Sequence, residues 1–150
     1  MTETASARGQ TSAPPSVVWR LLGEDYFGLA TWATAIGHSS AMTATPPGMG
    51  ASRRVQAGGA VLLENVVDWA PESALAYEIV GLPPVVSGVE NRWELEADGS
   101  GTSITLTCAV EPGPKPPMVV AAKAVARRIA KTNESLVADL IARAELEAAS

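Results

Sequence analysis

The 150-residue chain lacks several features that mark common protein classes. It has one cysteine and one histidine, so we expect no internal disulfide, no Cys/His zinc site and no other metal or cofactor. It has no run of about 18 apolar residues, so we expect no helix inserted in a membrane. Residues 1–15 are polar and lack the apolar core of a signal peptide. These absences predict a cytoplasmic protein.

Positive charge is scarce over much of the chain. Between Ala60 and Glu111 there are nine acidic residues and one basic residue, Arg92. Six of the eleven basic residues lie between Lys115 and Arg143, and we interpret this basic run as the solvated face of a helix. The chain has neither a denser basic patch nor aromatic residues interleaved with one, so we expect no nucleic-acid partner.

The chain has ample apolar content for a core. It is 47% hydrophobic and 18% charged, which is typical of a globular rather than a disordered protein. Its length predicts one domain over residues 1–150. Within that domain, the weak alternation of residues 1–12 leaves two alternatives, an edge strand or a tail.

The segment from Pro116 to about Ala148 predicts one long helix. Its apolar residues recur at spacings of three, four and seven and share one face, which comprises Met118, Ala122, Val125, Ile129, Leu136 and Leu140. The opposite face carries Lys123, Arg127, Lys131 and Glu134. At about 1.5 Å per residue the helix would be on the order of 50 Å long. It therefore crosses most of the domain and packs on the strands that precede it.

Those strands follow two short helices, predicted over Val17–Leu22, where Gly23 ends the first, and over Tyr26–Trp32. Alternating apolar residues and turn signals then predict six strands, at Ile36–Met42, Ser52–Ala57, Ala60–Trp69, Ala74–Val80, Val86–Ala97 and Thr102–Glu111. Gly58-Gly59 and Asp98-Gly99-Ser100-Gly101 are typical of hairpin turns. The order of elements predicts an α+β protein with an antiparallel sheet.

This ordered series resembles the START-like, or SRPBCC, superfamily, and within it bacterial polyketide cyclase/dehydratase-type proteins. The resemblance is carried by Ala13–Leu22, Phe27–Trp32, Gly50–Val55, Glu64–Pro71, Leu75–Ile79 and Asp98–Thr102. It implies a helix-grip fold, in which a curved antiparallel sheet of six to seven strands wraps around the long C-terminal helix. Two short helices follow the first strand. The space between sheet and helix would hold a hydrophobic small molecule.

Period-two alternation predicts which strand residues face that space. These inward residues and two residues of the helix are predicted to bind the ligand. Arg54 is added because it could hold an enolate or carboxylate. The predicted ligand-binding set is Arg54, Asn91, Trp93, Leu106, Cys108, Ile129 and Asn133. Asn91 is the strongly polar residue on its inward face. The buried amide of Asn133 needs a partner, either a protein group or a ligand. Cys108 is interpreted as a small core residue rather than a nucleophile.

Three residues are candidates for acid–base catalysis. Glu64 faces inward if the register of the family holds, and desolvation would then raise its pKa. Its alternatives are an outward, solvated position or a pair with Arg54. Tyr77 is either a catalytic hydroxyl or a core tyrosine that reaches a backbone group. His38 is a candidate proton shuttle, although no motif ties a nucleophile to it.

Three functions remain open, because a fold does not fix an activity. The first is a cyclase or dehydratase that folds a polyketide-like or aromatic chain in the cavity. The second is a carrier of a lipid or metabolite without chemistry, which would be favoured if the few polar cavity residues are all partnered by protein. The third is an interaction module with a filled cavity. We expect a monomer or a homodimer.

Overall fold

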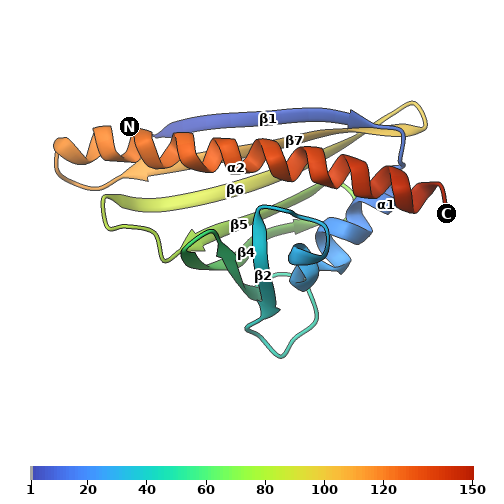
Figure 1. The fold of residues 1–150 in the computed structure, drawn as a ribbon, viewed down its shortest axis with the longest axis horizontal. Coiled ribbons are helices and arrows are strands. Elements are labelled where there is room, and N and C mark those ends of the chain that lie inside the picture. Colours follow the sequence, from blue (N-terminus) through green and yellow to red (C-terminus); the bar gives the residue numbers. More distant parts are fainter. Residues whose placement is uncertain (1) are drawn as a thin grey trace.

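The computed structural model describes residues 2–150, in which a seven-stranded antiparallel sheet packs against a long C-terminal helix (Figure 1). The strands are β1 (Glu3–Thr11), β2 (Ile36–Ala41), β3 (Ser52–Ala57), β4 (Ala60–Ala70), β5 (Ala74–Val80), β6 (Val86–Asp98) and β7 (Gly101–Pro112). Their order in the sheet is β1-β7-β6-β5-β4-β3-β2. The long helix is α2 (Pro117–Ala148). The predicted α+β helix-grip arrangement is confirmed, and the predicted bounds of the six strands and the long helix agree with these to within one residue.

The N-terminal segment is a strand and not a tail. β1 pairs with β7 along its whole length, from Glu3 opposite Val110 to Thr11 opposite Thr102. In the middle of the strand its residues that face α2 are small, namely Ala5, Ala7 and Gly9, and a Cβ on Gly9 would lie 2.5 Å from Cδ1 of Ile141. The alternation of β1 is therefore weak in the sequence because α2 approaches this strand too closely for large side chains.

Three short helical segments follow β1. α1 (Pro15–Trp19) continues directly as the π-helical turn η1 (Arg20–Glu24), and the 3₁₀ segment η2 (Tyr26–Thr31) comes next. The prediction that Gly23 ends the first helix is wrong, since the turn continues to Glu24. Gly23 serves packing instead, because a Cβ there would lie 2.5 Å from the Trp19 ring.

α2 covers only part of the concave face of the sheet. It lies against β1 and β7 and contacts β6 over a short stretch, as Figure 1 shows. Its buried residues are Ala122, Ala126, Asn133, Leu136, Val137, Leu140 and Ala144. From the predicted stripe, Met118, Val125 and Ile129 are only half-buried. No helix within residues 2–150 has the length and apolar character needed to cross a membrane.

Candidate functional site

A buried ion pair lies on the concave face, where β3 and β4 run side by side. Arg53 and Glu64 stand directly opposite each other in the register of the two strands. Nε of Arg53 donates to Oε1 of Glu64 at 2.8 Å, and Nη2 lies 2.7 Å from the same oxygen. Both side chains are more than nine-tenths buried. Glu64 therefore faces inward, and its partner is Arg53.

The aromatic rings of Tyr26 and Tyr77 enclose the Arg53 guanidinium. Its central carbon lies 3.9 Å from the Tyr26 ring centroid and 4.8 Å from that of Tyr77. Nη1 of Arg53 donates to the carbonyl of Tyr26 at 2.7 Å, and the Tyr26 hydroxyl donates to the carbonyl of Glu64 at 2.8 Å. Burial alone would lower the pKa of Arg53, but its acidic neighbours, Tyr26 first and then Glu64, outweigh burial and raise that pKa.

Two of the predicted residues lie away from this pair. Arg54 follows Arg53 on β3, so its side chain points to the opposite, outer face, and it is half-buried. Its Nη1 lies 3.5 Å from Nδ1 of His38, which is exposed on the edge strand β2. The predicted alternative of an Arg54–Glu64 pair is wrong. Extending the alternation from Val55, whose side chain is buried, identifies Arg53 as the inward arginine.

A second polar pair joins the sheet to α2. Asn133 of the helix donates from Nδ2 to Oδ1 of Asn91 at 3.0 Å, and Asn91 donates in return to Oδ1 of Asn133 at 3.3 Å. Both residues are buried. Of the two partners left open for the Asn133 amide, the structure gives a protein group, and Asn91 of β6 provides it.

The Tyr77 hydroxyl lies beside this amide pair. It accepts long hydrogen bonds from Nε1 of Trp93 at 3.4 Å and from Nδ2 of Asn91 at 3.5 Å. Within residues 2–150 it has no hydrogen-bond acceptor for its own proton, although the ring is 1% exposed. Burial raises the pKa of Tyr77 to about 12, so the hydroxyl stays protonated at neutral pH. It is a buried donor without an acceptor.

The remaining predicted ligand residues are apolar and fill the space under α2. Trp93, Leu106 and Cys108 are each at most 1% exposed on the concave face, while Ile129 is half-buried. Burial raises the pKa of the Cys108 thiol to about 11, which leaves it protonated and a poor nucleophile. In residues 2–150 no three His, Cys, Asp or Glu side chains are grouped as metal ligands would be.

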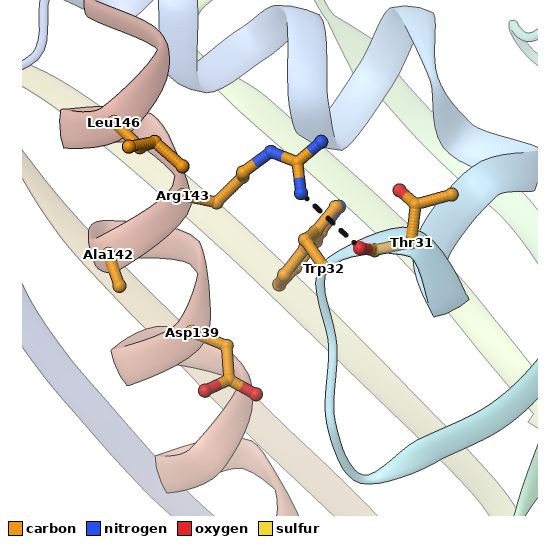
Figure 2. A pocket seen from close by; sticks show the side chains of 6 residues that line it. All are labelled: Thr31, Trp32, Asp139, Ala142, Arg143 and Leu146. Carbon is orange, nitrogen blue, oxygen red and sulfur yellow. Dashed lines mark hydrogen bonds between the residues drawn. The ribbon is translucent and has the colours of Figure 1, made fainter. Parts of the chain in front are cut away.

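Two surface pockets flank α2, and neither contains a predicted site residue. One, of about 250 Å³, lies between η2 and the C-terminal part of the helix and is shown in Figure 2; it is lined by Thr31, Trp32, Asp139, Ala142, Arg143 and Leu146. Nη1 of Arg143 reaches the carbonyl of Thr31 at 3.4 Å, and Asp139 accepts two bonds of 2.8 Å from Thr34. Nε1 of Trp32, although buried, has no partner within residues 2–150, which costs about 1–3 kcal/mol.

The other pocket, of about 310 Å³, lies between β1 and the N-terminal half of α2. It is lined by Glu3, Thr4, Ala5, Lys123, Ala126, Arg127 and Ala130. Alternation and helical period do not reveal either pocket, because each arises where two elements distant in sequence fail to meet. The Arg53–Tyr26 contacts likewise have no local signal in the sequence, because they join residues 27 positions apart.

The chain was compared with known protein families, curated proteins and solved structures. A family model described as "Polyketide cyclase / dehydrase and lipid transport" matches residues 4–140. The chain belongs to this family. The resemblance inferred from the sequence is thereby confirmed, and the family supports a fold that binds hydrophobic ligands. A search of curated proteins found no match.

Several solved structures share the fold of this family member. The protein TTHA0849 from Thermus thermophilus is 24% identical, with a TM-score of 0.74 over 99% of this chain and 100% of that one. The di-domain aromatase/cyclase StfQ of the steffimycin biosynthetic pathway is 12% identical, with a TM-score of 0.81 over 100% of this chain and 53% of that one. The ZhuI aromatase/cyclase from Streptomyces sp. R1128 is 17% identical, with a TM-score of 0.66 over 93% and 94%. At these identities the likeness concerns the fold alone.

Proposed function

We propose that the protein binds a hydrophobic small molecule with a hydrogen-bond-accepting group, on the concave face of its sheet beside α2, and carries it without changing it. The Tyr77 hydroxyl is the observation that carries this proposal. It is a buried donor on that face with no acceptor among residues 2–150, and a ligand carbonyl or hydroxyl oxygen would supply one. Ligand pockets commonly combine apolar walls with a few such polar points.

The route to this donor lies at the N-terminal half of α2. Ile129 shares a helical face with the buried residues Ala122, Ala126 and Asn133, yet it is itself half-buried. The sheet therefore covers this part of the helix incompletely. An apolar ligand that enters here would replace water against Ile129 and Val125, and it would move the Tyr77 and Trp93 rings as it reaches the centre.

The partners of Glu64 favour a carrier over an enzyme. General acid–base catalysis needs a group that can exchange a proton with the substrate. Glu64 is bound through Oε1 to a guanidinium that is enclosed by two rings, so its charge is already compensated. His38 is exposed on β2, away from the concave face. The amides of Asn91 and Asn133 are occupied by each other.

A cyclase or dehydratase is the second candidate, and the same Tyr77 donor is the feature that favours it. A protonated phenol beside a buried guanidinium could polarise a carbonyl oxygen during ring closure. In that case Tyr77→Phe would lower turnover by about 10²-fold or more, whereas in a carrier it would change affinity alone. The third candidate function is an interaction module with a filled interior, for which no small-molecule ligand is expected to bind.

The test is displacement of an apolar fluorescent dye from the folded protein by pairs of compounds that differ in one oxygen. We expect long-chain or aromatic ketones to bind more tightly than the hydrocarbons of the same shape. The preference should be about 3- to 10-fold, the worth of one hydrogen bond of about 0.5–1.5 kcal/mol. Tyr77→Phe should remove the preference, and the control Arg54→Gln on the outer face should keep it.

Two results would contradict the proposal. A cooperatively melting sample that binds neither the dye nor any compound of either series would favour the interaction module. A ketone preference that survives in Tyr77→Phe would show that another group binds the ligand oxygen.

A further inference from the structure

The net charge of the protein is −5, but its basic residues are concentrated in one segment. The 17 positions from Lys115 to Lys131 hold five basic residues and no acidic residue. The rest of the chain holds six basic and sixteen acidic residues. The N-terminal part of α2, with the residues just before it, is therefore strongly positive on an otherwise acidic molecule.

All five basic side chains of this segment are exposed: Lys115, Lys123, Arg127, Arg128 and Lys131. The salt bridges found within residues 2–150 use other basic residues, so these five have no carboxylate partner there. Val120 is 73% exposed, and Val120, Lys123, Arg127 and Lys131 follow one another at spacings of three and four. They form one strip, which we call the cationic strip, along the side of the helix next to the face that packs on the sheet.

The pocket of about 310 Å³ adjoins the cationic strip. Lys123 and Arg127 line it from α2, and its apolar surface comes from alanines, including Ala126 and Ala130. Glu3 of β1 is the one acidic residue that lines it. Two cations one helical turn apart beside a shallow, small-residue hollow suit a compact anion such as a lipid phosphate.

We propose that the cationic strip docks on the surface of an anionic phospholipid bilayer, with Val120 in the interfacial region and a headgroup phosphate between Lys123 and Arg127. Exposed cations around an exposed alkyl side chain are typical of helices that lie on anionic membranes. Nucleic acid is the less suitable partner, because no aromatic residue lies between positions 115 and 131 to stack on bases. The docking is peripheral and goes beyond the carriage of a ligand, although it would bring a carrier to a lipid source.

The experiment is sedimentation with vesicles of about one-third phosphatidylglycerol in phosphatidylcholine, compared with vesicles of phosphatidylcholine alone. We expect binding to the anionic vesicles at low salt, weaker binding as salt is added, and no binding to the neutral ones. Each cation near an anionic leaflet strengthens binding about five-fold, so Lys123→Gln/Arg127→Gln should weaken it by about 20- to 30-fold. Val120→Ser should weaken vesicle binding further without changing the charge.

The matched control is Arg8→Gln/Arg20→Gln, which removes two exposed cations from other elements and should leave vesicle binding near wild type. Equal losses in the two double variants would overturn the proposal, as would absence of binding to the anionic vesicles. If a duplex oligonucleotide binds more tightly than the vesicles, and if Lys123→Gln/Arg127→Gln abolishes that binding, the strip is assigned to nucleic acid instead. Dye binding is measured in parallel, so failure of the carrier function is distinguished from failure of docking.

Discussion

The two halves of the concave face are buried by different means. Under α2, the faces of β1, β7 and β6 are mostly apolar, and their fully buried polar contact with the helix is the neutral Asn91–Asn133 pair. At the end of β1, Thr11 also donates to Glu145 of α2 at 3.1 Å. Beyond the helix, β3 and β4 carry the charged Arg53–Glu64 pair, which η2 covers through Tyr26. We refer to these as the helix-covered half and the ion-pair half.

This difference shows how a sheet wider than its helix can bury its inner face. A helix supplies apolar side chains but has few free backbone groups, so the helix-covered half suits a core of apolar residues. The short η2 segment offers the carbonyl of Tyr26, which accepts a hydrogen bond from Arg53, and the Tyr26 hydroxyl, which donates to the carbonyl of Glu64. The first half should therefore depend on packing, and the second on the completeness of its hydrogen bonds.

The largest effect is expected from removing α2, which covers the helix-covered half. A fragment of residues 1–117 loses the burial of Leu136, Val137 and Leu140, worth about 1.5–3 kcal/mol for each large apolar side chain. Typical net stabilities are about 5–15 kcal/mol, so the fragment should aggregate or be digested rapidly. Circular dichroism and limited proteolysis test this, and a cooperatively melting fragment would show that the core lies elsewhere.

Breaking the ion pair should be the largest single-residue effect in the other half. Glu64→Gln leaves a buried guanidinium without its counter-charge, which should lower the free energy of unfolding by about 3–5 kcal/mol. Asp68→Asn breaks the exposed Asp68–Arg92 pair and should cost at most about 1 kcal/mol. The double variant Arg53→Met/Glu64→Leu should recover much of the loss. Chemical denaturation measures all three, and a Glu64→Gln cost equal to that of the control would contradict the comparison.

High pH should destabilise the protein through Tyr77, which contacts Arg53 of the ion-pair half and Asn91 of the helix-covered half. The pKa of Tyr77 is raised to about 12, so the unfolded chain, in which tyrosine titrates near pH 10, loses the phenolic proton first. The protonated Tyr77 therefore contributes its full share to the free energy of unfolding below about pH 10. This contribution falls by roughly 2–3 kcal/mol as the pH rises through 12. Unfolding free energies across this range should decline less steeply for Tyr77→Phe. Tyrosinate absorbance with an ordinary midpoint in the folded protein would refute the prediction.

The smallest effect is expected from the neutral pair of the helix-covered half. Asn133→Ala leaves the Asn91 amide without its main partner, at a cost of about 1–3 kcal/mol. Gln10 bonds Asp98 and Ser103 at the exposed surface, so Gln10→Ala should stay within about 0.5 kcal/mol of wild type. Thermal denaturation compares the two. A loss in Asn133→Ala larger than that in Glu64→Gln would reverse the order proposed for the two halves.

The sequence predicted the fold well where periodicity is strong and less well where contacts are distant. The stripe of α2 and the alternation around Asn91 and Trp93 gave the correct faces, because each pattern is local. The inward direction of Glu64 followed from the register of the family. Its partner did not, because Arg53 and Arg54 are adjacent and only the pairing of β3 with β4 selects one of them. The cover that Tyr26 provides depends on a contact across 38 positions, between the Tyr26 hydroxyl and the Glu64 carbonyl, and has no local signal.

The position of Cys108 makes its thiol a probe of how often the helix separates from the sheet. It is the one thiol of the chain and is 1% exposed, opposite Ala5 on one side and Asn91 on the other. A thiol reagent can reach it only when the structure opens, so the rate of its modification measures how often the interior is open. A ligand that binds the closed form slows that rate in proportion to its occupancy. The occupancy of the interior can thus be followed by the reactivity of a single sulfur atom, without a label on the ligand.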